Sequence, residues 1–135
     1  MNIDSLKRQH KEIIEVVQKI ERMLQPQTVE QKSFDIAIQI GMLAGKLLIH
    51  LKSEDQYLYP ALTQHSNKNI QLISKRFMSE MGTIAEVFTK YKTTYMVASN
   101  IKAKPEQFIA DSNKIFETIK KRILAEDKDL YPLLN

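Results

Sequence analysis

The sequence predicts an all-α protein, an up-down-up-down four-helix bundle built from two repeated helical hairpins. Three observations favour this class. The 135-residue chain contains only three glycines and four prolines, which leaves few breaks for a sheet of many strands. Apolar residues recur in steps of three and four along four long stretches, as they do on one face of a helix. The two halves of the chain also resemble each other, and we interpret residues 1–135 as one domain.

Loop-forming residues divide the chain into four stretches. Pro60 should disrupt the last turn of the second helix, because proline cannot donate a backbone hydrogen bond. Pro105 suits the first turn of the fourth helix. We expect helices over residues 4–24, 28 or 33 to 59, 70–98 and 105–130.

Polar side chains interrupt the apolar stripes of three of these helices. Because a stripe faces the core, these side chains should point inward, where an unpaired charge costs several kcal/mol. Each of them therefore needs a partner inside the bundle. The tyrosines, in contrast, are interpreted as packing residues. The inward-facing polar residues are His10, His50, Glu54, Arg122 and Glu126.

The two halves of the sequence repeat each other. HLKSEDQYLYPAL at residues 50–62 aligns with RILAEDKDLYPLL at 122–134, an offset of 72. HKEIIEVVQK at 10–19 aligns with MGTIAEVFTK at 81–90, an offset of 71. The near-equal offsets indicate that each half is one helical hairpin and that the two hairpins face each other.

Four of the inward-facing residues are candidate metal ligands. His50 and Glu54 are four residues apart, which places both on one helix face. His10 lies on the neighbouring helix, and Glu126 is the repeat counterpart of Glu54. Imidazole nitrogens and carboxylate oxygens that converge inside a helical bundle are a usual way to hold iron, manganese or zinc.

These residues and their order resemble the hemerythrin-like (HHE cation-binding) domain family over nearly the whole chain. The resemblance implies a four-helix bundle that usually holds a non-haem di-iron centre, with histidines on all four helices and two bridging carboxylates. It also implies oxygen binding, sensing of oxygen, nitric oxide or redox state, or iron handling. The matching pattern is His10, His50-x-x-x-Glu54, Leu58-Tyr59-Pro60, Glu126 and Leu130-Tyr131-Pro132.

The resemblance implies a role for each of the four candidate ligands. His10 and His50 would bind one iron, and Glu54 and Glu126 would be the bridging carboxylates. On the third helix, however, Met81 stands where the family has a histidine. A thioether is a poor ligand for iron or zinc, so the second ion loses a ligand there.

A second departure falls on the fourth helix, where Arg122 replaces the expected histidine. Arginine stays protonated and offers only donors, so it cannot bind a metal. We therefore expect one iron or zinc ion rather than a full di-iron centre. Arg122 lies one turn before Glu126 and should pair with both Glu54 and Glu126, supplying part of the charge that a metal would bring.

Three functions are consistent with this pattern. The first is a cation-binding domain with one metal ion and a sensing or metal-handling role, for which a small diatomic ligand is compatible. The second is a metal-free bundle in which the arginine pairs with the two glutamates and the fold acts as a regulatory or protein-interaction domain. The third is an enzyme that uses a single iron and oxygen, for which the sequence shows no substrate pocket.

Composition and charge limit the binding partners and the cellular compartment that we expect for this protein. The net charge is +4, but the lysines are spread over the whole chain, so we expect no nucleic-acid partner. The stretch 36–51 is interrupted by Gln39, Lys46 and two glycines, which we interpret as too short and too polar to span a membrane. No apolar run opens the sequence, and the absence of cysteine fits a reducing compartment. We expect a cytoplasmic protein.

Overall fold

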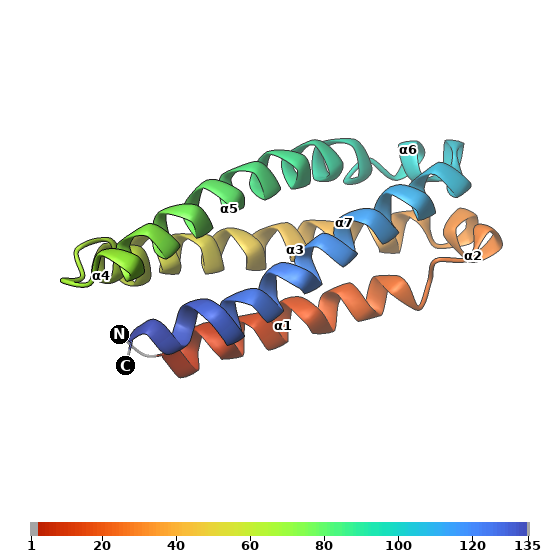
Figure 1. Ribbon diagram of the computed structural model, residues 1–135. Helices are drawn as coiled ribbons and strands as arrows, with labels where there is room; N and C mark the ends of the chain where they lie inside the picture. The colour runs from red at the N-terminus through yellow and green to blue at the C-terminus, as the bar shows by residue number, and fades with distance from the viewer. Residues whose placement is uncertain (1–2, 135) are drawn as a thin grey trace.

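The computed structural model describes residues 3–134 of the chain, and most of them are helical (Figure 1). No strand occurs among these residues, which confirms the all-α class. The elements are α1 (Ile3–Glu21), α2 (Pro26–Gln31), α3 (Ser33–Ser53), the π-helical segment η1 (Glu54–Leu58), α4 (Tyr59–Thr63), α5 (Lys68–Tyr95), α6 (Ala98–Ala103), α7 (Pro105–Ala125), the π-helical segment η2 (Glu126–Leu130) and the 3-10 helix η3 (Tyr131–Leu134).

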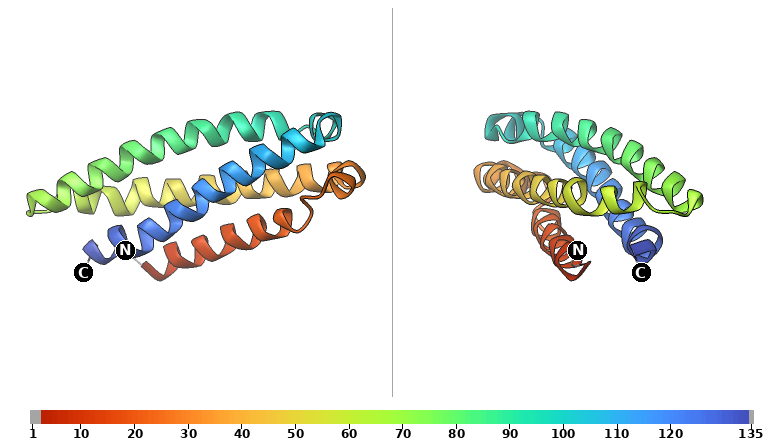
Figure 2. Two further views of the ribbon diagram at one scale, coloured as in Figure 1. Left: turned by 45° about the vertical axis from the view of Figure 1, so that its right-hand side comes forward. Right: turned by 90° about the vertical axis from the view of Figure 1, so that its left-hand side faces the viewer.

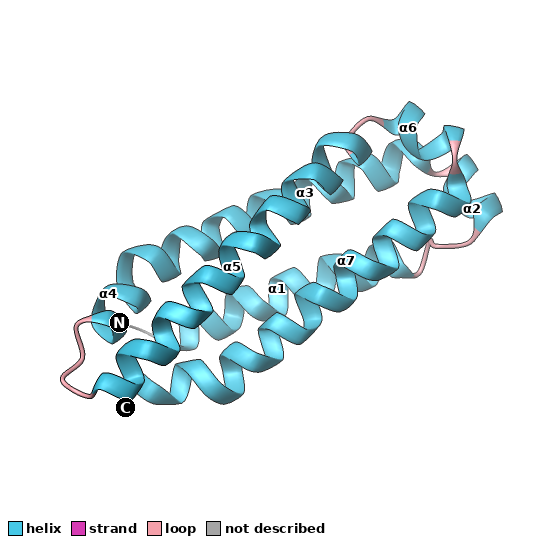
Figure 3. Ribbon diagram, turned by 45° about the horizontal axis from the view of Figure 1, so that its top comes forward, coloured by secondary structure: helices cyan, strands magenta, loops and turns pink. Residues whose placement is uncertain are grey.

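The long helices α1, α3, α5 and α7 lie lengthwise beside one another (Figures 1 and 2). Helix α1 packs along α3, and α7 contacts both α5 and α1. The short helices α2 and α6 lie at one end of the molecule, and α4 lies at the other (Figure 1). Figure 3 shows that the loops are confined to these two ends, so the middle of the molecule is lined only by helix.

The second long helix does not stop at Pro60, where the sequence led us to expect a disruption. The helical path continues through η1 and α4 to Thr63. The Tyr59 amide bonds to the carbonyl of Glu54, five residues earlier, so the turn before the proline is widened. Pro60 then falls in the first turn of α4, where its missing amide hydrogen costs no hydrogen bond. The first helix ends at Glu21, three residues before the expected bound.

Two apolar clusters form the core, one on each side of a polar layer. The larger cluster includes Ile13 and Leu47, and the smaller one includes Leu6 and Leu58. All four side chains are buried, and burial of each stabilises the fold by about 1.5–3 kcal/mol. On α1 and on α3–η1 the buried polar residues lie between members of the two clusters. The helices therefore hold a polar layer inside an otherwise apolar interior.

One stretch, Ser33–Thr63, is long and apolar enough to cross a membrane by length and composition, with a mean hydropathy of 1.5 over its most apolar window. The expectation that this region is too short and too polar to span a bilayer is therefore not confirmed. The core helix of a soluble protein can meet the same criterion, but such a helix is mostly buried, whereas 33% of the most apolar part of this stretch is buried. The absence of a membrane partner stays a prediction.

Candidate metal centre

The polar layer brings together the four candidate ligands from four separate segments. His10 comes from α1 and His50 from α3, while Glu54 and Glu126 are the first residues of η1 and η2. All four side chains are buried, and one potential ligand atom from each lies within 4.8 Å of the others. The helix-face spacing in the sequence therefore predicted this convergence correctly.

The ligand atoms lie at the separations expected around a single ion. The Nε2 atoms of His10 and His50 are 3.0 Å apart. Oε1 of Glu126 lies 2.8 Å from Nε2 of His10 and 3.3 Å from Nε2 of His50. Oε2 of Glu54 lies 3.3 Å from Nε2 of His50. Nitrogen and oxygen ligands about 2.0–2.2 Å from a common ion are separated from each other by about 3 Å, so these residues fit one cation.

The outer nitrogens of both histidines are held by hydrogen-bond acceptors. Nδ1 of His10 lies 2.9 Å from Oδ1 of Asp127, and Nδ1 of His50 lies 2.8 Å from Oε1 of Gln9. The Gln9 amide is oriented by its Nε2, which donates to Oγ of Ser53 at 3.2 Å. Because a carboxylate and an amide oxygen only accept, each Nδ1 carries a proton, and in the neutral imidazole each Nε2 lone pair faces the centre. This tautomer is the one that binds a metal through Nε2.

Tyr131 is a member of the cluster that the sequence analysis had interpreted only as a packing residue. Its hydroxyl donates to Oε2 of Glu54 at 2.8 Å and lies 3.0 Å from Nε2 of His10. It also lies 3.2 Å from Oε1 of Glu126. The π-helical geometry of η2 brings residues five apart onto one face, which places Tyr131 beside Glu126. The hydroxyl oxygen of Tyr131 is therefore a fifth atom at ligand-to-ligand distance from the other four.

Arg122 lies on the side of the cluster that faces away from the histidines, and its side chain does not extend to water. Its side chain is buried, and Nε donates to Oε2 of Glu126 at 2.9 Å. Nη2 donates to Oη of Tyr59 and to the carbonyl of Phe77, each at 2.9 Å, and the guanidinium lies 4.6 Å from the centroid of the Phe77 ring. The expected pairing of Arg122 with Glu126 is present. Pairing with Glu54 is absent among the described residues, because the arginine is held on the far oxygen of Glu126.

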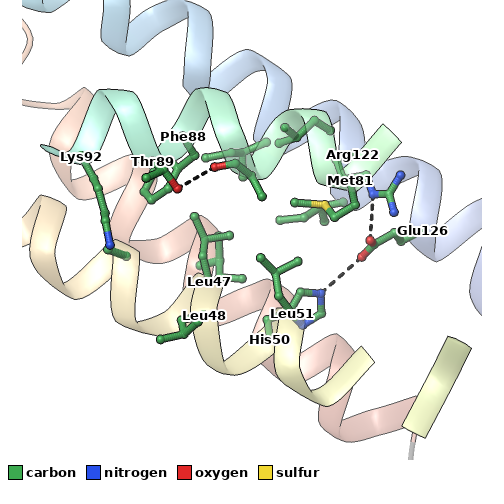
Figure 4. Close-up of a pocket in the computed structure, with 16 residues that line it drawn as sticks. Leu47, Leu48, His50, Leu51, Met81, Phe88, Thr89, Lys92, Arg122 and Glu126 are labelled. Atoms are coloured by element: carbon green, nitrogen blue, oxygen red, sulfur yellow. Dashed lines mark hydrogen bonds and ion pairs between the residues drawn. The ribbon is translucent and has the colours of Figure 1, made fainter. Parts of the chain in front are cut away.

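Met81, the other residue in place of a family histidine, is partly buried and lies beside Arg122 (Figure 4). It lines a pocket whose inner end also includes His50 and Glu126. Its thioether makes no hydrogen bond within the described part of the chain. Met81 therefore adds no hard donor beside the cluster.

Burial and hydrogen bonding shift the protonation of the cluster in opposite directions. In the metal-free protein burial raises the pKa of Glu126, but hydrogen bonds from His10 and His50, when their Nε2 atoms are protonated, outweigh this effect and hold the pKa below its usual range. Burial is also the main reason why the pKa of Glu54 is raised. Burial and the neighbouring carboxylates raise the pKa of Tyr131, so the phenol keeps its proton. With neutral histidines, two carboxylates face one guanidinium, which leaves one negative charge uncompensated.

Two buried polar atoms in this layer have no hydrogen-bond partner: Oε1 of Glu54 and Nη1 of Arg122. An unpaired buried carboxylate oxygen is costly, and it is one of the features expected where a cation is a partner. The chemistry of the donor set and this unpaired oxygen both fit a metal ion.

The helical fold and the buried histidine–carboxylate cluster together define a class of protein that holds a cation between its helices. The chain belongs to the hemerythrin HHE cation-binding domain family, whose model matches residues 1–134. This match confirms the family resemblance found in the sequence. A search of curated proteins and a search of solved structures gave no match.

Proposed function

We propose that this chain binds one divalent cation, iron or zinc, through His10, His50, Glu54 and Glu126. The scaffold is an up-down-up-down four-helix bundle made of two repeated hairpins, each of which supplies part of the ligand set. The single observation that carries the proposal is the convergence of two Nε2 lone pairs and two carboxylate oxygens in a buried layer.

This convergence is difficult to maintain without a positive charge at its centre. The two imidazole nitrogens face each other at 3.0 Å with their protons on the opposite, Nδ1, sides. Among the described residues, the donors that reach the four ligands from outside the histidines are the hydroxyl of Tyr131 and Nε of Arg122, and the arginine is on the far oxygen of Glu126. A group of buried acceptors with so few donors loses several hydrogen bonds to water, and a divalent cation restores that energy.

We propose one ion rather than two because Arg122 lies on the side of Glu126 where a second ion would bind. A bridging carboxylate would offer one oxygen to each of two ions. Here Oε1 of Glu126 faces the histidines, whereas Oε2 accepts from Nε of Arg122 at 2.9 Å. The guanidinium therefore takes the oxygen that a second ion would need, and Met81 adds no ligand on that side.

The set of two imidazoles and two carboxylates suits either iron or zinc, and the metal supplies Lewis-acid chemistry, with redox chemistry added if it is iron. Positions beyond the four protein ligands would be open to a small diatomic molecule. We propose a sensing or metal-handling role on this basis. The protein residues hold the histidine tautomers, place a phenol proton beside Glu54 and exclude water from the layer.

Metal analysis of the protein purified without chelator tests the proposal directly. We expect about one metal ion per chain, and His50→Ala should lose it. His65→Ala is the matched control, because His65 lies in the turn before α5 and outside the cluster. A metal-free protein whose melting temperature is unchanged by EDTA would overturn the proposal.

A metal-free regulatory bundle is the second candidate, and one observation favours it. In the absence of metal, burial lowers the pKa of His50, but hydrogen bonds to Glu126 and Glu54 outweigh this effect and raise it to about 9. A protonated His50 together with Arg122 would then balance both carboxylates without a metal. The same metal analysis separates the two candidates.

A further inference from the structure

A pocket of about 120 Å³ opens between α3 and α5 and ends at the polar layer (Figure 4). Met81 and Arg122 lie at its inner end together with Glu126. Lys92 lies at the other end and reaches from α5 toward α3. The two ends are 11 residues apart on one helix, so the pocket follows about 16 Å of α5.

The wall between these two ends is apolar. An apolar cavity of about 150 Å³ holds benzene in another protein. This pocket, at about 120 Å³, is somewhat smaller, and it has room for a short alkyl chain that extends toward Lys92. Its small lining residues, Ala44 and Ala85, leave space between the larger ones. The larger apolar side chains in the wall are Ile13, Leu47, Leu51, Ile84, Phe88, Ile119 and Ile123.

The charges at the two ends of the pocket differ. Lys92 is half-buried and forms no ion pair among the described residues. At the inner end the guanidinium of Arg122 already donates to Glu126, Tyr59 and Phe77, and its remaining nitrogen, Nη1, is buried. Lys92 is therefore the cation that an acidic group entering the pocket meets first. The charge pattern selects an anionic head at Lys92 and an apolar body directed inward.

We propose that this pocket binds a small apolar monocarboxylic acid, with its carboxylate on Nζ of Lys92 and its hydrocarbon part against Leu47, Phe88 and Met81. The head pairs with a charge that has no ion-pair partner among the described residues, and the hydrocarbon part leaves water for a preformed apolar wall. The proposal goes beyond metal binding, because none of these contacts requires an ion in the polar layer.

Calorimetric titration of octanoate into the full chain tests the proposal. We expect saturable binding of about one octanoate per chain, with and without EDTA. Lys92→Met should weaken octanoate binding about fivefold, the size expected for one partly exposed ion pair, and should leave the binding of octanol unchanged. Lys90→Met is the matched control, because this exposed lysine lies two residues away and outside the pocket.

A second readout locates the ligand. Met81 has a methyl group at the inner end. In protein labelled with carbon-13 at the methionine methyl groups, the Met81 resonance should shift when octanoate is added. The Met81→Leu variant assigns this resonance. Ala85→Phe should prevent the binding of both octanoate and octanol, because the larger side chain fills the pocket. Octanol binding as tightly as octanoate in the unchanged protein, or an unshifted Met81 signal at saturation, would overturn the proposal. Loss of octanoate binding on EDTA treatment would also overturn it while leaving the metal proposal intact.

Discussion

Arg122 and Glu126 form a buried ion pair one turn apart, with Nε of the arginine 2.9 Å from Oε2 of the glutamate. The other oxygen of Glu126 lies 2.8 Å from Nε2 of His10. One carboxylate therefore joins an arginine on one side to a histidine on the other. Both charges of the pair are almost fully buried, so each depends on the other for its stability.

Removal of the arginine should destabilise the protein. Arg122→Met strands Glu126 without its closest cation, and breaking a buried pair typically costs about 3–5 kcal/mol. We expect the free energy of unfolding of EDTA-treated protein, measured with urea, to fall by about 3 kcal/mol. Lys121→Met is the control, because its partner Glu117 lies on the surface, and it should leave the free energy unchanged. A loss below about 0.5 kcal/mol in Arg122→Met would contradict the internal ion pair.

The outer partners of the histidines should tune metal affinity. Asp127→Ala removes the acceptor that holds Nδ1 of His10, and such substitutions typically lower metal affinity by about 10–100-fold. Competition with a metal chelator measures the change. Asp129→Ala is the matched control, because this exposed carboxylate lies two residues further along η2. Equal affinities in the two variants would show that Asp127 does not support the site.

The four candidate ligands could be predicted from sequence because a straight α-helix repeats its faces every three to four residues. His50 and Glu54 occupy such positions, and the repeat then selects Glu126. Tyr131 could not be found in this way. It lies five residues after Glu126, which on an α-helix is a different face, and only the π-helical turn of η2 brings the two together.

The outer partners Asp127 and Gln9 were missed for another reason. Each is adjacent to a ligand position on the polar side of an amphipathic helix, where exposed charged and amide residues are ordinary. Nothing in their spacing separates them from solvated neighbours. Their role depends on how the helices are rotated against each other, which is a property of packing rather than of local pattern.

The metal-free protein should lose stability as pH rises above neutrality. The pKa of His50 is about 9 in the folded state and 6.5 in the unfolded chain, so folding binds the proton more tightly. The resulting stabilisation is complete below pH 6.5 and is lost as pH rises from 6.5 to about 9. We expect the free energy of unfolding to fall by up to about 3 kcal/mol over this interval, measured with urea in EDTA.

Comparison with His50→Gln isolates this effect, because the variant keeps a polar side chain but cannot gain the proton. The fall between pH 6.5 and 9 should be absent from it. Metal binding should show the opposite trend, because an ion needs the deprotonated imidazole and its affinity rises over the same interval. Identical pH profiles for the two metal-free proteins would contradict the raised pKa of His50.

The hydroxyl of Tyr131 should stabilise the layer through Glu54. Tyr131→Phe keeps the ring but removes the donor that lies 2.8 Å from Oε2 of Glu54, and it leaves that oxygen without its donor. An unsatisfied buried acceptor costs about 1–3 kcal/mol, and we expect a loss of this size in urea unfolding of EDTA-treated protein. Tyr57→Phe is the control, since Tyr57 is 53% exposed and should show no change. Equal changes in the free energy of unfolding of the two variants would contradict a stabilising hydrogen bond from Tyr131 to Glu54.

Placing histidines at the two positions where the family resemblance implies them should add a second metal ion. In the double variant Met81→His/Arg122→His, imidazoles replace the thioether and the guanidinium, and Oε2 of Glu126 is released from Nε of the arginine. That oxygen can then bind a second cation, so the metal content should rise from about one to about two ions per chain. Arg122→Met alone frees the same oxygen without adding a ligand, and it should stay at one ion. If the folded double variant also stays at one ion, Arg122 does not occupy the position of a second metal, and the single-ion site has another cause.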